Sequence, residues 1–292
     1  MEAHLISSFS FRSRLFRLAL SGAVLFAFSD SAAAQSKPVT FVGAVDFPTI
    51  YFFRGIRQET DPKFTTFLAG DLGISLLSDG SGGVSTVGIN VGTWNALMTG
   101  SSGSDGPEDS AFYESDVYAG VTLGFQNGVS VTPMFTAYTS PNDMFTTVKE
   151  VSFKVAHGSK YAPYGLVAFE FGDDDSGQAD GGHLGDGKKG TYLELGIGPS
   201  WPVAGGKATI GVPIKLALSL KDYYEHPITG EDNKFGYIDG GVLITIPFAE
   251  KFNVHGGVNV LGFGDTTAFF NGDEEGDRSS WVIASVGLGF TF

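Results

Sequence analysis

The chain has no cysteine among its 292 residues. Disulfide bridges and thiolate metal sites are therefore excluded. After residue 28 the sequence also lacks any run of about 18 apolar residues, the length that a helix needs to cross a bilayer. Helix-favouring runs are scarce, whereas glycine (42 residues) and phenylalanine (26 residues) are abundant. This composition favours strands over helices.

Positive charge is also scarce. The net charge is −14, and it becomes −15 without residues 1–34, which hold three arginines and two acids. A surface of this sign repels phosphate, so we expect no nucleic-acid partner.

The first 34 residues have the pattern of a secretory signal peptide. Three arginines precede the apolar stretch 18–28, and small residues lead to Gln35. The apolar stretch is too short to serve as a membrane anchor. We expect cleavage before Gln35, export, and a single domain over residues 35–292.

The rest of the chain alternates apolar and polar residues with a period of two. In 207–220, for example, isoleucine, valine and leucine share one face while lysine, threonine and serine share the other. Only a strand separates such sets. The pattern predicts twelve strands, near 40–54, 63–77, 84–97, 111–125, 129–140, 146–157, 161–172, 190–202, 206–220, 235–248, 252–263 and 280–292; ten or fourteen are alternatives.

The connections between these segments alternate in length. Short turns such as Asn127-Gly128 alternate with long polar connectors such as 172–190 and 264–280. This asymmetry is typical of an outer-membrane β-barrel, with short periplasmic turns and long external loops. We therefore predict an all-β fold, a transmembrane antiparallel up-and-down barrel of about 12 strands in the cell outer membrane. A secreted β-sandwich is the alternative.

Aromatic residues mark the expected strand ends and resemble two interfacial girdles. The short-turn end has Phe125, Trp201, Phe248, Phe252 and Phe292; the loop end has Tyr51, Phe53, Phe64, Tyr113 and Phe171. Alternation up to the terminal Phe292 predicts a lipid-facing last strand that closes the barrel. It also resembles the terminal signature by which the barrel-assembly machinery recognises such proteins. Lipid and lipopolysaccharide are further expected partners, the latter through Lys149.

If the apolar faces meet lipid, the polar faces line the lumen. The predicted pore-lining residues are Asp46, Arg54, Asp71, Asn90, Glu114, Asp116, Glu150, Lys154, Glu170, Glu194, Lys215 and Asp239, with His255 and Asn259 beside them. Eight acids face three bases. This excess indicates a narrow, cation-preferring pore; a salt-bridged, filled interior is the alternative, since twelve strands lie between filled and open barrels.

The segment "YFFRG" (51–55) places Arg54 at the top of the first predicted strand, on the inward face. Two interpretations stand. Arg54 is either an interfacial residue that reaches water or a lumenal one paired with Asp46 or Asp71.

This Tyr-x-Phe-Arg-Gly segment, with Gln58 after it, resembles the N-terminal block of the TorF family of putative porins. Segments 92–96 and 113–121 resemble later strands of that family more loosely. The resemblance covers about the first half of the mature chain. It implies a pore-forming role.

No catalytic constellation is evident. His157 lies at a predicted periplasmic turn, whereas His255 lies in the interior of a predicted strand, and no motif partner identifies His255 as a base. The acidic loops 172–187 and 271–278 could bind Ca²⁺ through clustered oxygens, but they lack the spacing of an EF-hand, so we expect solvated loops there. We predict a non-enzymatic, cofactor-free channel for passive diffusion of small solutes or ions. A non-conducting barrel whose loops bind a ligand is the alternative, and an outer-membrane hydrolase is third.

Overall fold

The computed structural model describes residues 38–59, 61–102, 110–171 and 189–292. The predicted signal peptide (1–34) and most of the acidic connector 172–190 lie outside these residues. The elements are β1 (Val39–Pro48), β2 (Phe52–Phe53), β3 (Ile56–Arg57), β4 (Thr65–Leu77), β5 (Val84–Met98), β6 (Phe112–Phe125), β7 (Val129–Thr139), β8 (Val148–His157), β9 (Tyr164–Phe171), β10 (Thr191–Ile197), β11 (Ser200–Val203), the 3₁₀ turn η1 (Ala204–Gly206), β12 (Ala208–Gly211), β13 (Ile214–Lys221), β14 (Phe235–Ala249), β15 (Phe252–Phe263), α1 (Asp265–Asn271) and β16 (Ser280–Thr291).

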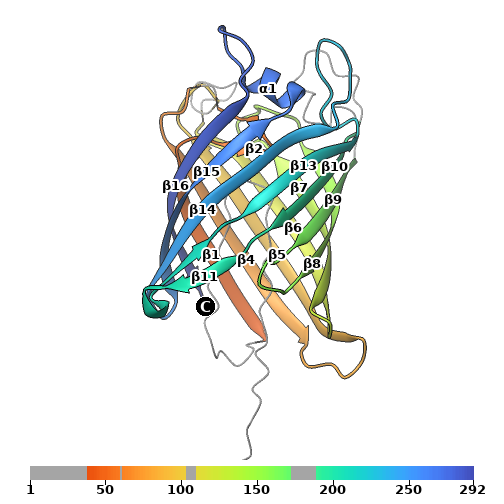
Figure 1. Ribbon diagram of the computed structural model, residues 1–292, viewed down its shortest axis with the longest axis vertical. Coiled ribbons are helices and arrows are strands. Elements are labelled where there is room, and N and C mark those ends of the chain that lie inside the picture. Colours follow the sequence, from red (N-terminus) through yellow and green to blue (C-terminus); the bar gives the residue numbers. More distant parts are fainter. Residues whose placement is uncertain (1–37, 60, 103–109, 172–188) are drawn as a thin grey trace, which may run out of the picture.

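The described strands form one closed antiparallel barrel with twelve wall strands (Figure 1). Neighbours in sequence pair with each other around the wall, and β1 pairs with both β4 and β16 to close it. The backbone of Phe292 completes the closure, exchanging hydrogen bonds of 3.1 and 2.8 Å with Phe41. The predicted fold class is confirmed.

Two wall strands are interrupted, and proline explains both breaks. β10 and β11 form one wall strand that breaks before Pro199, and β12 and β13 form another that breaks at Pro213. Pairing keeps the same register on either side of each break. Proline has no N–H to donate, so the ladder loses bonds there without a change in direction.

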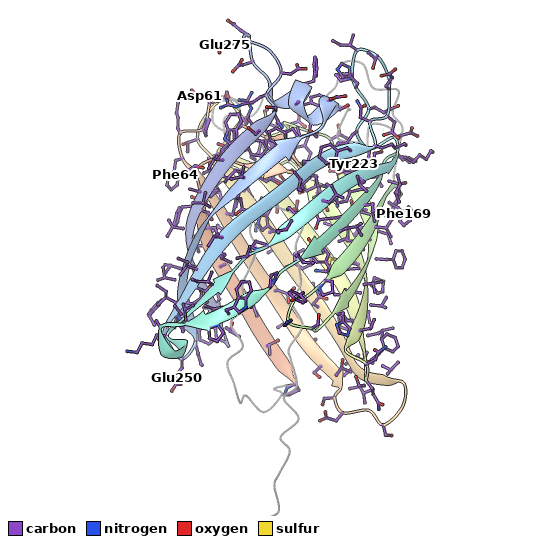
Figure 2. The ribbon with its side chains drawn as sticks, in the orientation of Figure 1. Asp61, Phe64, Phe169, Tyr223, Glu250 and Glu275 are labelled. Atoms are coloured by element: carbon purple, nitrogen blue, oxygen red, sulfur yellow. The ribbon has the colours of Figure 1, made fainter. Side chains whose placement is uncertain are left out.

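The outer surface of the wall is apolar. Side chains such as Phe169, Val242 and Leu288 point outward and are more than two-fifths exposed; Figure 2 shows Phe169 projecting from the wall. Such a surface requires lipid, and a closed barrel leaves no unpaired strand edge within it. The protein is an outer-membrane barrel. No helix among the described residues is long and apolar enough to cross a membrane.

The two ends of the barrel differ. Short turns and both termini of the wall lie at one end, where Glu250 marks the β14–β15 turn (Figure 2). By the rule for such barrels this is the periplasmic end. Long connections and α1 lie at the other, extracellular end (Figure 1).

The predicted first strand is wrong at its end. β1 stops at Pro48, and residues 49–58 turn back into the barrel mouth as the short hairpin β2–β3. Tyr51 and Phe52 are each 1% exposed there, within two hydrophobic clusters rich in aromatic rings. Tyr51, Phe53 and Tyr113 therefore pack inside rather than forming part of an outer girdle. We call residues 49–58 the mouth hairpin.

Candidate functional site

The inner wall carries the polar residues that the alternation assigned to it. All but one of the predicted pore-lining residues lie on wall strands with their side chains inward, where they are buried or half-buried. These residues are Asp46, Asp71, Asn90, Glu114, Asp116, Glu150, Lys154, Glu170, Glu194, Lys215 and Asp239. That they line a conducting path stays a prediction.

Arg54 is the exception, because it comes from the mouth hairpin and not from a wall strand. Its guanidinium donates to both carboxylate oxygens of Glu150 on β8, at 2.7 and 2.9 Å. The two residues are 3% and 2% exposed. Both earlier interpretations of Arg54 are therefore wrong in detail: it does not reach water at the interface, and its partner is neither Asp46 nor Asp71.

The backbone of the mouth hairpin turns sharply at Arg54. Arg54 and Gly55 have φ of 46° and 84°, and they connect the pairs Phe53–Ile56 and Phe52–Arg57. Two central residues with positive φ are the mark of a type I′ hairpin turn. This turn aims the Arg54 side chain across the lumen toward β8.

Aromatic rings surround the guanidinium. It lies 4.1 Å from the ring centroid of Tyr192 on β10 and 5.4 Å from that of Tyr223 in the β13–β14 loop. The Tyr223 hydroxyl accepts a hydrogen bond of 2.8 Å from Arg54, and Tyr138 donates one of 3.3 Å to Glu150. A buried ion pair needs such additional bonds and stacking to offset its desolvation.

External loops hold the mouth hairpin from above. The Tyr224 hydroxyl donates to the Arg54 carbonyl at 3.0 Å. The side-chain amide of Asn271, at the end of α1, accepts from the Arg57 N–H at 2.8 Å and donates to the Gly55 carbonyl at 2.7 Å. Thr266 of α1 in turn donates to the Tyr224 carbonyl at 3.0 Å. The mouth is thus closed by one hairpin fastened to two loops.

Further carboxylates lie near the Arg54–Glu150 pair. Glu114 and Asp116 lie close together on β6 beneath Tyr51, and Glu170 on β9 accepts from the Gly190 N–H at 2.9 Å. Among described residues, Oδ1 of Asp116 and Nε of Arg54 are buried without a hydrogen-bond partner. One guanidinium therefore faces several acids and does not neutralise them all.

A second group of charged side chains lies on strands β8, β10, β13 and β14. Glu194 accepts hydrogen bonds from Tyr164 and Tyr192, at 2.7 and 2.6 Å. On the neighbouring strands, Lys215 lies 3.5 Å from Asp239. Lys154 stacks over the Tyr164 ring at 4.5 Å.

A third polar group connects the first and last strands. His255 on β15 is bonded through Nε2 to Asp46 at 2.7 Å and through Nδ1 to Asn253 at 2.9 Å. The first contact passes directly over Gly287 of β16, where any side chain would collide with both partners. Among the described residues, no serine or threonine hydroxyl bonds to His255, and Oδ2 of Asp46 has no partner.

Sequence reasoning placed His255 in the lumen but missed this pairing. Asp46 and His255 are 209 residues apart, so only closure of the barrel brings them together. Their shared inward parity was the one available signal.

No group of three or more metal-binding side chains occurs among the described residues. Loop 271–278 belongs to this part of the chain, whereas 172–187 lies outside it.

No protein-family model and no curated protein matches the sequence, so the TorF resemblance stays a prediction. Among solved structures, the chain is similar to the NanC porin, with 10% identity and a TM-score of 0.46 over 86% of this chain and 98% of that one. It is also similar to outer membrane phospholipase A from Escherichia coli, with 14% identity and a TM-score of 0.46 over 86% of this chain and 92% of that one. A third similar structure is the translocator domain of the autotransporter NalP from Neisseria meningitidis, with 10% identity and a TM-score of 0.43 over 88% of this chain and 89% of that one. Similarity at this level transfers no function to this chain.

Proposed function

We propose that the protein is an outer-membrane channel for small solutes or ions with a preference for cations. The observation that carries this proposal is the charge inside the closed barrel, where eight carboxylates of the wall face two lysines of the wall and Arg54 of the mouth hairpin. Unneutralised acids at membrane depth are costly and are typical of ion pathways. A narrow lumen of one sign raises the local concentration of counter-ions.

Several of these acids have no basic partner. Asp71 accepts a hydrogen bond from the amide of Asn90, at 3.3 Å, and has no described cation within ion-pair distance. Glu170 is held by a backbone N–H. Neither carboxylate has a basic partner among the described residues that would compete with a passing cation, unlike Glu150, which Arg54 neutralises.

In this proposal the mouth hairpin is the constriction. It fills the extracellular end, and passage of a solute requires that it moves. Such movement breaks the polar bonds that hold the hairpin and exposes the rings of Tyr51 and Phe52, which are each 1% exposed in the structure. Among the described residues, the Arg54–Glu150 pair is the one ion pair that holds the mouth hairpin inside.

The filled mouth also favours a second function. Tyr51, Phe52 and Arg54 are almost fully buried, as expected for a non-conducting barrel whose external loops bind a ligand. If the barrel has that function, neither the wild type nor a variant with altered charge on the inner wall would pass ions. A hydrolase would require a nucleophile beside His255.

Ion flux from proteoliposomes tests the proposal. Vesicles that contain the refolded mature protein should release potassium faster than chloride, and Asp71→Asn should reduce that ratio about two- to threefold by removing one lumenal charge. Glu250→Gln is the control, because it removes the same charge from an exposed periplasmic turn. No protein-dependent flux, or an equal effect of both variants, contradicts the proposal.

A further inference from the structure

The arginines of the mature chain are concentrated at the extracellular mouth. Apart from the predicted signal peptide, the sequence has only Arg54, Arg57 and Arg278. Arg54 is neutralised by Glu150. Arg57 on β3 and Arg278 in the β15–β16 loop converge on one ring, that of Trp281 at the start of β16.

The two guanidinium groups share this ring at close range. The carbon of the Arg278 guanidinium lies 3.7 Å from the Trp281 ring centroid, and that of Arg57 lies 5.4 Å from it. In the part of the chain that the structure describes, neither arginine has a carboxylate within ion-pair distance. Two guanidinium groups that lie close together usually share an anionic partner, because their like charges repel each other.

The backbone fixes both arginines in place. The Arg57 N–H is bonded to Asn271, and its guanidinium donates to the Gly272 carbonyl at 3.3 Å. The Arg278 N–H donates to the Ala268 carbonyl of α1 at 3.0 Å. Partial burial, followed by the charge of Arg278, lowers the pKa of Arg57 from its ordinary value. The pair is thus held together despite repulsion.

Nearby acids do not satisfy the pair. Asp273 partly offsets the repulsion at Arg57 without forming an ion pair. Its Oδ1 is used within its own turn, where it accepts from the Glu275 N–H at 2.9 Å. Glu275 lies at the tip of the loop, away from the barrel (Figure 2). Asp277 and Glu274 are exposed.

We propose that Arg57 and Arg278 bind an oxyanion, the carboxylate or phosphate of a small extracellular solute, with Trp281 as the platform beneath it. The planar fork of each guanidinium matches such oxygens with paired hydrogen bonds. An anion between the two would also remove their mutual repulsion.

The position of Trp281 indicates whether the anion comes from a free solute or from lipid. Its side chain faces inward and packs against Phe52 of the mouth hairpin, with ring centroids 5.4 Å apart. The site therefore opens toward the barrel mouth and not toward lipid. This favours a free solute over the phosphates of lipopolysaccharide. The site does not depend on the proposed channel activity, since a non-conducting barrel could use it equally.

Tryptophan fluorescence of the full mature protein, refolded in detergent free of lipopolysaccharide, tests the proposal. Inorganic phosphate or citrate, added at constant ionic strength, should produce a saturable change that Trp281→Phe abolishes. Arg57→Gln and Arg278→Gln should each weaken the apparent affinity about tenfold or more. Lys149→Gln is the matched control, because it removes a positive charge from the outward face of β8.

Three results would overturn the proposal. The first is no saturable change with either anion. The second is an equal loss in Lys149→Gln, which would indicate general screening. The third is a response to purified lipopolysaccharide alone, which would assign the pair to lipid. Folding of each variant is checked by its heat-modifiable gel mobility. If Arg57→Gln does not fold, Arg57→Lys replaces it. This variant keeps the positive charge but loses the planar guanidinium, so its affinity for the anion should lie between that of wild type and complete loss.

Discussion

Arg54 and Glu150 join the mouth hairpin to the barrel wall. Two charge-assisted hydrogen bonds, of 2.7 and 2.9 Å, connect residues that are 96 positions apart in the chain. Both side chains are almost fully buried. We therefore expect the pair to help keep residues 49–58 inside the lumen, together with the bonds from Tyr224 and Asn271.

Glu150→Gln should release the mouth hairpin. The substitution leaves the Arg54 charge buried and unpaired, which typically costs about 3–5 kcal/mol. We expect faster trypsin cleavage after Arg54 or Arg57 in the folded barrel, measured by mass spectrometry. The double variant Arg54→Met/Glu150→Met should be less susceptible at Arg57 than Glu150→Gln, because it leaves no buried charge. Equal protection of wild type and Glu150→Gln would show that the pair does not hold the hairpin.

Gly55→Ala should also weaken the mouth hairpin, for two separable reasons. Gly55 has φ of +84°, and an added Cβ would lie 2.5 Å from the Tyr237 ring. Gly205→Ala is the control, because Gly205 has φ of +68° but open space around it. We expect Gly205→Ala to lower the free energy of unfolding by about 1 kcal/mol through backbone strain alone. Gly55→Ala should lower it by more, as measured by urea unfolding in detergent. Equal losses would exclude the collision with Tyr237.

Acid should loosen the β13–β14 loop before the barrel unfolds. Partial burial raises the pKa of Asp232, but hydrogen bonds from Lys234, Ser219 and the Asp222 N–H outweigh it and hold the pKa below its ordinary value. The stabilisation is therefore present above the unfolded-state pKa and is lost as pH falls through the folded-state value.

Hydrogen exchange of residues 222–234 reports this change. Protection of the loop, corrected for intrinsic exchange, should fall as the pH drops below the ordinary range of aspartate, and Asp232→Asn should lack this dependence. A wild-type loop with protection independent of pH would contradict the assignment.

Removal of Phe292 should impair assembly more than stability. Its backbone forms two hydrogen bonds with Phe41, and its exposed ring contacts Phe252 at the periplasmic edge. We expect the truncated chain to refold in detergent but to reach the outer membrane in much lower yield, measured by fractionation of cells. A yield equal to that of wild type would argue against recognition through this residue. Phe248→Ala is the control for a lost aromatic ring at the same end.

The wall strands could be predicted because each carries its own signal. Alternation over ten or more residues assigns a face, and short turns such as Asn127-Gly128 fix where a strand reverses. Most predicted boundaries agree with the structure within two or three residues. The interruptions at Pro199 and Pro213 fell inside predicted strands, because the apolar pattern continues across them.

The mouth hairpin could not be predicted in this way. Period two tells which side of a strand a residue occupies, but it does not tell whether the segment has left the wall. Tyr51 and Phe53 continue the pattern of β1 and were therefore assigned to an outer girdle, whereas the turn at Arg54 carries them inside. An Arg-Gly pair with positive φ is less recognisable than the usual Asn-Gly.

Partners within the lumen also escape sequence reasoning. Inward parity gathers Glu150, Asp46 and His255 on the lumenal side of the wall, whereas Arg54 reaches the lumen through the turn of the mouth hairpin. Which of them touch depends on strand tilt and on the closure of β1 with β16, neither of which is written in a local pattern. The pairing Arg54–Glu150 is the clearest example.

The most direct test of the proposed channel is the reversal potential of the refolded mature protein in a planar bilayer, under a potassium chloride gradient. We predict discrete current steps with a reversal potential directed toward that of potassium, and more frequent openings for Glu150→Gln than for wild type. A folded barrel that passes no current in either form, or a reversal potential directed toward that of chloride, would contradict the account.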